Sequence, residues 1–249
     1  MKKLPLASSM AWLLRFAGFD VKTVEGGYKN YRNFVLQQFD NQGFKAIVLG
    51  GKTGSGKTLI LKELEKLGEQ IIDLEAIAQH KGSAFGWIGE SQQGSTEQFE
   101  NDLYEICRKI DPNRRVWIEN ESRSVGAVFI PQGLWNMMKA APLIHIEVPF
   151  DLRVQHLIED YTGTSKEDLT LAFEKISKKL GHEALTKAKI AVEKGDFATA
   201  AAIGLKYYDK TYTHSFDTNI VTAKHILEVE GRDNEKTAKI LIDFVDSNL

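Results

Sequence analysis

Residues 51–58 read Gly51-Lys52-Thr53-Gly54-Ser55-Gly56-Lys57-Thr58. A glycine, four further residues and then Gly-Lys-Thr is the spacing of a phosphate-binding P-loop. Small residues let consecutive backbone N–H groups curl around phosphate oxygens without Cβ clashes, so all eight residues are candidate phosphate ligands. Lys57 would reach the terminal phosphates, which makes it a candidate catalytic residue. The Thr58 hydroxyl is a candidate Mg²⁺ ligand.

The sequence on either side of this loop predicts a strand before it and a helix after it. Phe44–Leu49 is a short continuous apolar run, typical of a strand buried on both faces of a parallel sheet. Thr58–Leu67 has helical spacing, which Gly68 ends. Further strands are predicted at Gln70–Leu74, Val116–Ile118 and Leu143–Val148. The alternation of strands and helices predicts an α/β fold, a P-loop NTPase-like doubly wound parallel sheet.

The C-terminal part adds helices and one more strand. Ser165–His214 has an almost wholly helical pattern, so we expect a helical insertion at about residues 160–215. Ile226–Val229 is strand-like and is expected to rejoin the sheet, and Asn234–Val245 is expected to form a final helix. Together these elements predict one P-loop domain over residues 41–249.

The first 40 residues have a different pattern. A helix-like run at Ser9–Phe16 precedes a strand-like run at Asp20–Val24 and an aromatic stretch at Tyr28–Phe39. About 40 residues cannot bury a core alone. We therefore expect residues 1–40 to pack on the rest, or to be the end of a domain that begins elsewhere.

Composition is that of an ordinary globular protein. The formal net charge is −2, so any nucleic-acid site must be a local patch, such as the lysines between Lys175 and Lys189 with Tyr207, Tyr208 and Tyr212. No apolar run approaches the roughly 20 residues that span a bilayer. Cys107 is the single cysteine, so a disulfide framework is excluded, a buried helical thiol is expected, and a cytoplasmic location is favoured.

Several polar residues follow the predicted strands, where ligands collect in open α/β sheets. Glu119 is the first candidate for an acidic Mg²⁺ partner, and Asp73 is a second and a candidate catalytic residue. Arg123 is a candidate catalytic cation, while Ser83 and Arg153 are candidate phosphate ligands. The alternatives are solvated loop acids and surface ion pairs.

Four clusters occur in a fixed order, at Gly51–Thr58, Asp73–Gly86, Glu119–Gly126 and Pro149–Tyr161. Together they resemble the C-terminal P-loop domain of tRNA 2-selenouridine synthases. Ser8–Phe19 and Val24–Tyr28 resemble the closing part of that family's N-terminal rhodanese domain. The resemblance covers nearly the whole chain.

The resemblance implies a transferase that acts on tRNA at the wobble 2-thiouridine. It implies geranyl diphosphate and selenophosphate as substrates, first for S-geranylation and then for replacement of the S-geranyl group by selenium. The rhodanese cysteine loop would stand where this sequence reads Met1–Ala7, so residues 1–40 are interpreted as a remnant without that loop. Selenium exchange is not expected of this chain alone. Two interpretations stay open: a truncated product, or one half of a split enzyme whose partner polypeptide carries the rhodanese half and its cysteine.

Two alternatives remain open at this point. One is a small-molecule kinase or NTPase of the P-loop class, which would bind and hydrolyse ATP or GTP with Mg²⁺. The other is a non-catalytic nucleotide-binding module that regulates a partner. Turnover of nucleotide that depends on Lys57 would favour the first, and tight binding without turnover would favour the second.

Overall fold

A computed structural model describes residues 6–40, 43–216, 224–229 and 233–249, with the side chains of Leu6 and of residues 211–216 left out. The Met1–Ala7 segment therefore lies mostly outside the described residues, and so does the Tyr212 side chain. None of the helices in the described part is long and apolar enough to cross a membrane.

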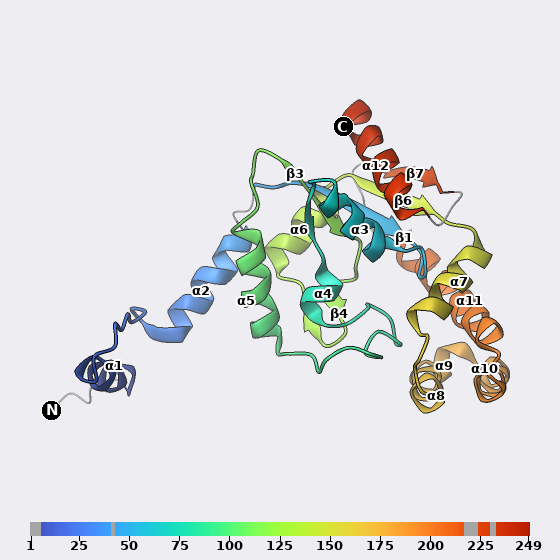
Figure 1. The fold of residues 1–249 in the computed structure, drawn as a ribbon, viewed down its shortest axis with the longest axis horizontal. Coiled ribbons are helices and arrows are strands. Elements are labelled where there is room, and N and C mark those ends of the chain that lie inside the picture. The colour runs from blue at the N-terminus through green and yellow to red at the C-terminus, as the bar shows by residue number, and fades with distance from the viewer. Residues whose placement is uncertain (1–5, 41–42, 217–223, 230–232) are drawn as a thin grey trace.

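A five-stranded parallel sheet forms the centre of the fold, in the order β2-β3-β1-β6-β7 (Figure 1). Its strands are β1 (Lys45–Gly51), β2 (Gln70–Ile72), β3 (Arg115–Glu119), β6 (Leu143–Glu147) and β7 (Lys224–Glu228). The α/β prediction is confirmed, and the last strand rejoins the sheet as expected. Because β1 is central, the loop that follows it opens near the middle of the carboxyl edge of the sheet.

Helices cover both faces of the sheet. The helices α3 (Lys57–Lys66) and α12 (Asn234–Asn248) share one apolar cluster with β1, β3 and β6. The helices α2 (Gly27–Asp40), α5 (Thr96–Cys107) and α6 (Gln132–Ala140) share the cluster on the opposite face. This is the doubly wound arrangement that the alternating pattern predicted.

The alternation of side chains along β1 explains why its whole run is apolar. Ala46 and Val48 belong to the cluster under α2 and α5, whereas Ile47 and Leu49 belong to the cluster under α3 and α12. Successive side chains of a strand point to opposite faces, so a strand covered on both sides needs apolar residues at every position. This burial fixes the position from which the P-loop begins.

Smaller elements complete the carboxyl edge and the helical part. The segment after β2 forms the short helix α4 (Leu74–Ala78), and β4 (Ser124–Val125) pairs with β5 (Val128–Phe129) as an antiparallel hairpin. The helical part then consists of α7 (Phe150–Asp160), α8 (Lys166–Lys175), α9 (Ser177–Leu180), α10 (His182–Lys194) and α11 (Phe197–Phe216). A third apolar cluster lies among α8, α10 and α11 and includes Phe85 from the loop after α4.

The N-terminal helices differ in how they pack. Val35 and Phe39 of α2 are buried in the same cluster as the sheet, so α2 packs on the rest of the chain. The helix α1 (Leu6–Phe16) projects beyond the end of α2 (Figure 1). The strand predicted at Asp20–Val24 is wrong, because these residues pair with no strand, and the Arg15 guanidinium instead donates to the Val21 carbonyl oxygen at 2.7 Å.

Candidate functional site: a phosphate loop beside three carboxylates

The P-loop joins the end of β1 to the first turn of α3. Gly54 and Gly56 both have φ of 78°, the left-handed region that residues with a Cβ rarely adopt. A Cβ at Gly54 would lie 2.9 Å from the Arg153 carbonyl oxygen, and a Cβ at Gly51 would lie 2.5 Å from the Ser55 hydroxyl oxygen. The loop therefore needs its glycines both for its backbone angles and for its close packing.

Two side chains prepare this loop for an anion. The Lys57 ammonium donates to the Gly51 carbonyl oxygen at 3.0 Å, which folds the lysine back over the loop. Ser55 is only 2% exposed, and its hydroxyl oxygen has no hydrogen-bond partner in the described part of the chain. Buried polar groups are almost always hydrogen-bonded, so this unsatisfied hydroxyl fits a site that is completed by a bound oxyanion.

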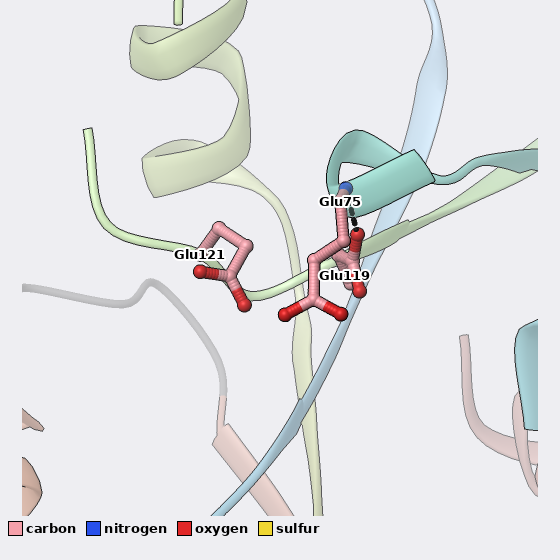
Figure 2. A group of neighbouring side chains, drawn as sticks. All are labelled: Glu75, Glu119 and Glu121. Carbon is pink, nitrogen blue, oxygen red and sulfur yellow. Dashed lines mark hydrogen bonds between the residues drawn. The ribbon is translucent and has the colours of Figure 1, made fainter. Parts of the chain in front are cut away.

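Three glutamates meet beside the loop, at the ends of β2 and β3 (Figure 2). The Glu119 carboxylate is fully buried and accepts the Glu75 backbone N–H at 2.7 Å, while its second oxygen has no partner among the described residues. Ligand oxygens of Glu75, Glu119 and Glu121 lie within 4.8 Å of one another. The Thr58 hydroxyl donates to the Glu75 carboxylate at 3.1 Å, which joins the cluster to the P-loop.

Burial and mutual repulsion raise the pKa of each carboxyl group in this cluster. Desolvation is the largest cause for all three: it raises the pKa of Glu121 to about 7, that of Glu119 well above its usual range, and that of Glu75. Neighbouring carboxylates raise these pKa values further, while Lys57 opposes the rise at Glu75 and Glu121. A cation between these oxygens would relieve the repulsion.

In the metal-free protein, the free energy of unfolding is expected to fall as the pH rises from about 4.5 to about 7. Glu121 has an ordinary pKa of 4.5 when unfolded but about 7 when folded. Across this window the folded state binds more protons than the unfolded state, so raising the pH favours unfolding. Urea titrations in EDTA at several pH values measure this slope. A Glu121→Gln variant should flatten it, whereas Glu65→Gln, at an exposed glutamate, should leave it unchanged.

If the free energy of unfolding has the same slope against pH in the wild-type protein and in Glu121→Gln, burial does not raise the pKa of Glu121 in the folded state.

The remaining predicted site residues fall into two groups. Asp73 lines the same cleft as the P-loop, and its carboxylate caps α4 by accepting the Ala76 backbone N–H at 2.8 Å. Ser83 also lines this cleft. By contrast, Arg123 is exposed and does not line the cleft. Lys52 is partly exposed and does not line the cleft either. The catalytic and phosphate-binding roles remain predictions.

Arg153 has a structural contact that the sequence did not indicate. Its guanidinium, 4% exposed, forms a two-pronged ion pair with the Asp209 carboxylate of α11 at 2.7 and 2.8 Å. It also donates to the Thr53 carbonyl oxygen of the P-loop at 3.1 Å, and His156 Nδ1 lies 2.8 Å from the Gly54 carbonyl oxygen. In this arrangement Arg153 joins the phosphate loop to the helical part.

The cleft over the P-loop has a volume of about 590 Å³, within the range of roughly 300–1,000 Å³ that is usual for small-molecule sites. Its cations include Lys57, Lys62 and Lys81. Its acidic side chains are Asp73, Glu75, Glu90, Glu121, Glu159 and Asp160. Glu75 and Glu121 were missed from the sequence. Glu121 stands two residues past Glu119 and so tends toward the same side of an extended chain, whereas Glu75 lies in the first turn of α4, which begins just after Asp73.

The lysines of the expected patch, Lys175, Lys187 and Lys189, do not line the P-loop cleft, and neither does Cys107. Lys187 and Lys189 pair with Glu183 and Glu174, at 2.6 and 2.7 Å, and the Lys175 ammonium stands over the Trp87 ring at 4.2 Å from its centroid. Cys107 is buried at the end of α5, as expected, and burial raises the pKa of its thiol to about 12. This thiol is therefore not a nucleophile near neutral pH.

Comparison with known families matches most of the chain. Residues 44–235 match the family model described as the tRNA 2-selenouridine synthase AAA domain. The chain is 31% identical, over 81% of its length, to the tRNA 2-selenouridine synthase of Sulfurovum sp. and spans 63% of that protein. It is 36% identical, over 60% of its length, to that of Cupriavidus pinatubonensis and spans 41% of it.

A comparison of folds matches shikimate kinase from Acinetobacter baumannii in complex with shikimate. The TM-score is 0.41 at 17% sequence identity, over 86% of this chain and 98% of that one. The sheet order described above, rather than this match, establishes the fold.

Proposed function

Because the chain belongs to the tRNA 2-selenouridine synthase family, we propose that it is the phosphate-binding part of a tRNA-modifying transferase. Its substrates would be a tRNA with a wobble 2-thiouridine and geranyl diphosphate. The observation that carries this proposal is the P-loop with its unsatisfied Ser55 hydroxyl, which suits a diphosphate held as a leaving group.

The reaction at this site would be a displacement at carbon. The sulfur of 2-thiouridine attacks C1 of the geranyl group, a carbon–sulfur bond forms, and the carbon–oxygen bond to diphosphate breaks. The N3 proton of the base is released to water, which gives the neutral S-geranyl product. The bonding electron pair leaves with the diphosphate oxygen, where negative charge develops. The backbone N–H groups of the P-loop and the Lys57 ammonium would stabilise this charge because they are already positioned around it.

The carboxylate cluster has the donor set of a magnesium site. Thr58, Glu75, Glu119 and Glu121 offer only oxygen ligands, which Mg²⁺ prefers, and one buried Glu119 oxygen has no other partner among the described residues. We propose that these residues hold Mg²⁺, which would neutralise charge on the diphosphate. With no cation, the acidic side chains of the cleft would oppose an anionic ligand.

Replacement of the S-geranyl group by selenium from selenophosphate is the second step that we propose for the family activity. The single cysteine of these 249 residues, Cys107, is buried with a raised thiol pKa and lies outside the cleft. We therefore propose that a cysteine needed in this step lies outside these 249 residues, in a rhodanese domain.

Titration of the purified protein with geranyl diphosphate and with a 2-thiouridine tRNA tests the proposal. Both should bind at modest salt, and tRNA affinity should fall steeply as salt rises because backbone contacts release counterions. The same tRNA with unmodified uridine is the control for the sulfur. Failure of either substrate to bind at low salt would refute the proposed function.

A further inference from the structure

A second cavity, of about 270 Å³, lies beside the P-loop cleft. It is formed between α7, α8, α10 and α11, and Phe85 from the loop after α4 also lines it. Apolar side chains dominate its walls, among them Leu157, Phe173, Val192 and Phe197. The cavity is thus suited to a hydrocarbon group rather than to a charged one.

This apolar cavity adjoins the phosphate cleft. Five residues line both spaces: Thr53, Ser83, Leu157, Tyr161 and Tyr208. The Tyr208 hydroxyl accepts the Ala84 backbone N–H at 2.8 Å, so the polar end of this ring is held at the boundary. An anion site that adjoins an apolar cavity fits a ligand with a charged head and a hydrocarbon chain.

Gly204 of α11 keeps part of this cavity open. It lies within a helix and has no positive φ, so its backbone conformation does not require glycine. A Cβ placed there would meet only the Phe173 ring, at 3.8 and 3.9 Å, which is ordinary van der Waals contact. Since glycine is unfavourable within helices, the empty space that it leaves is its most evident consequence here.

We propose that the apolar cavity holds the hydrocarbon chain of a prenyl diphosphate whose diphosphate group lies on the P-loop, and that Gly204 and Phe173 limit the length of that chain. The inference rests on the proposed function, because it takes the P-loop as the diphosphate site. It adds the residues that would select among prenyl donors: a longer side chain at position 204 shortens the cavity, and a smaller one at position 173 lengthens it.

The test compares inorganic diphosphate with prenyl diphosphates of five, ten and fifteen carbons by isothermal titration calorimetry. In the wild-type protein the ten-carbon donor should bind tighter than inorganic diphosphate. Gly204→Leu should weaken the ten-carbon donor by roughly 10- to 100-fold, the scale of a mismatch of one or two methylenes in an apolar pocket. Binding of inorganic diphosphate and of the five-carbon donor should change little.

Ala198→Leu is the matched control, because it adds the same side chain to an exposed position of the same helix and should change neither affinity. Phe173→Ala should improve binding of the fifteen-carbon donor relative to the ten-carbon donor, which gives a second readout if Gly204→Leu does not fold. Unchanged ten-carbon binding in folded Gly204→Leu would overturn the inference. So would equal wild-type affinity for inorganic and prenyl diphosphate. Absence of diphosphate binding altogether would instead refute the P-loop assignment and the proposed function.

Discussion

Replacing Lys57 with alanine is expected to slow geranyl transfer by roughly 10²- to 10³-fold, the usual cost of removing one positioned donor from a developing anion. The Lys57 ammonium already lies over the loop, 3.0 Å from the Gly51 carbonyl oxygen. It also opposes the rise in the pKa values of Glu75 and Glu121, so its loss removes positive charge from the middle of an acidic cleft. Both effects oppose the departure of a diphosphate.

Single-turnover rates of S-geranyl product formation measure this effect, with circular dichroism to show that the variant is folded. Lys52→Ala is the matched control, because Lys52 belongs to the same loop but its side chain does not line the cleft. Its backbone N–H survives the substitution, so only a small effect is expected. Similar rates for the Lys57→Ala variant and the wild-type protein would show that this lysine does not stabilise the leaving group.

Replacing Asp209 with alanine is expected to lower the free energy of unfolding by about 3 kcal/mol, the low end of the cost of breaking a buried ion pair. The Arg153 guanidinium is 4% exposed and would lose both oxygens of its partner. The low end applies because the Asp209 side chain is 27% exposed, so water screens part of the interaction. Since Arg153 also contacts Thr53, the variant should bind diphosphate more weakly.

Urea unfolding curves measure the stability effect, and calorimetry measures diphosphate binding. Glu183→Ala removes one partner of the exposed pair with Lys187 and should leave the curve unchanged. Replacing Arg153 and Asp209 together by leucine should recover most of the lost stability, since an apolar pair leaves no charge unpaired. If Asp209→Ala unfolds at the same urea concentration as the wild-type protein, the ion pair does not stabilise the junction between the P-loop and the helical part.

The parts of the fold that depend on local pattern could be predicted from the sequence. The P-loop spacing at Gly51–Thr58 and the apolar run before it determine a strand, a turn and a helix within about 20 residues. The final strand was also predictable, because its apolar side chains lie between two helical segments. Asp20–Val24 has the same kind of pattern but finds no neighbouring strand, and pattern alone does not supply a partner.

The parts of the site that depend on tertiary contact could not be predicted in the same way. Glu75 and Glu119 are separated by 44 residues and meet only because β2 and β3 are adjacent in the sheet. The contact between Arg153 and Asp209 spans 56 residues and depends on how α7 packs on α11. The apolar cavity is built from the same residue types, at the same helical spacing, that would fill an ordinary core.

We propose above all that the P-loop binds the diphosphate of a prenyl donor during transfer to tRNA. A single-turnover reaction of the purified protein with geranyl diphosphate, Mg²⁺ and a 2-thiouridine tRNA tests it, with mass spectrometry of the digested tRNA and assay of released diphosphate. We expect S-geranyl-2-thiouridine and inorganic diphosphate in equal amounts, both formed roughly 10²- to 10³-fold more slowly in Lys57→Ala. No S-geranyl product, together with Lys57-dependent hydrolysis of ATP or GTP, would contradict it and identify the protein as a nucleotide-hydrolysing enzyme.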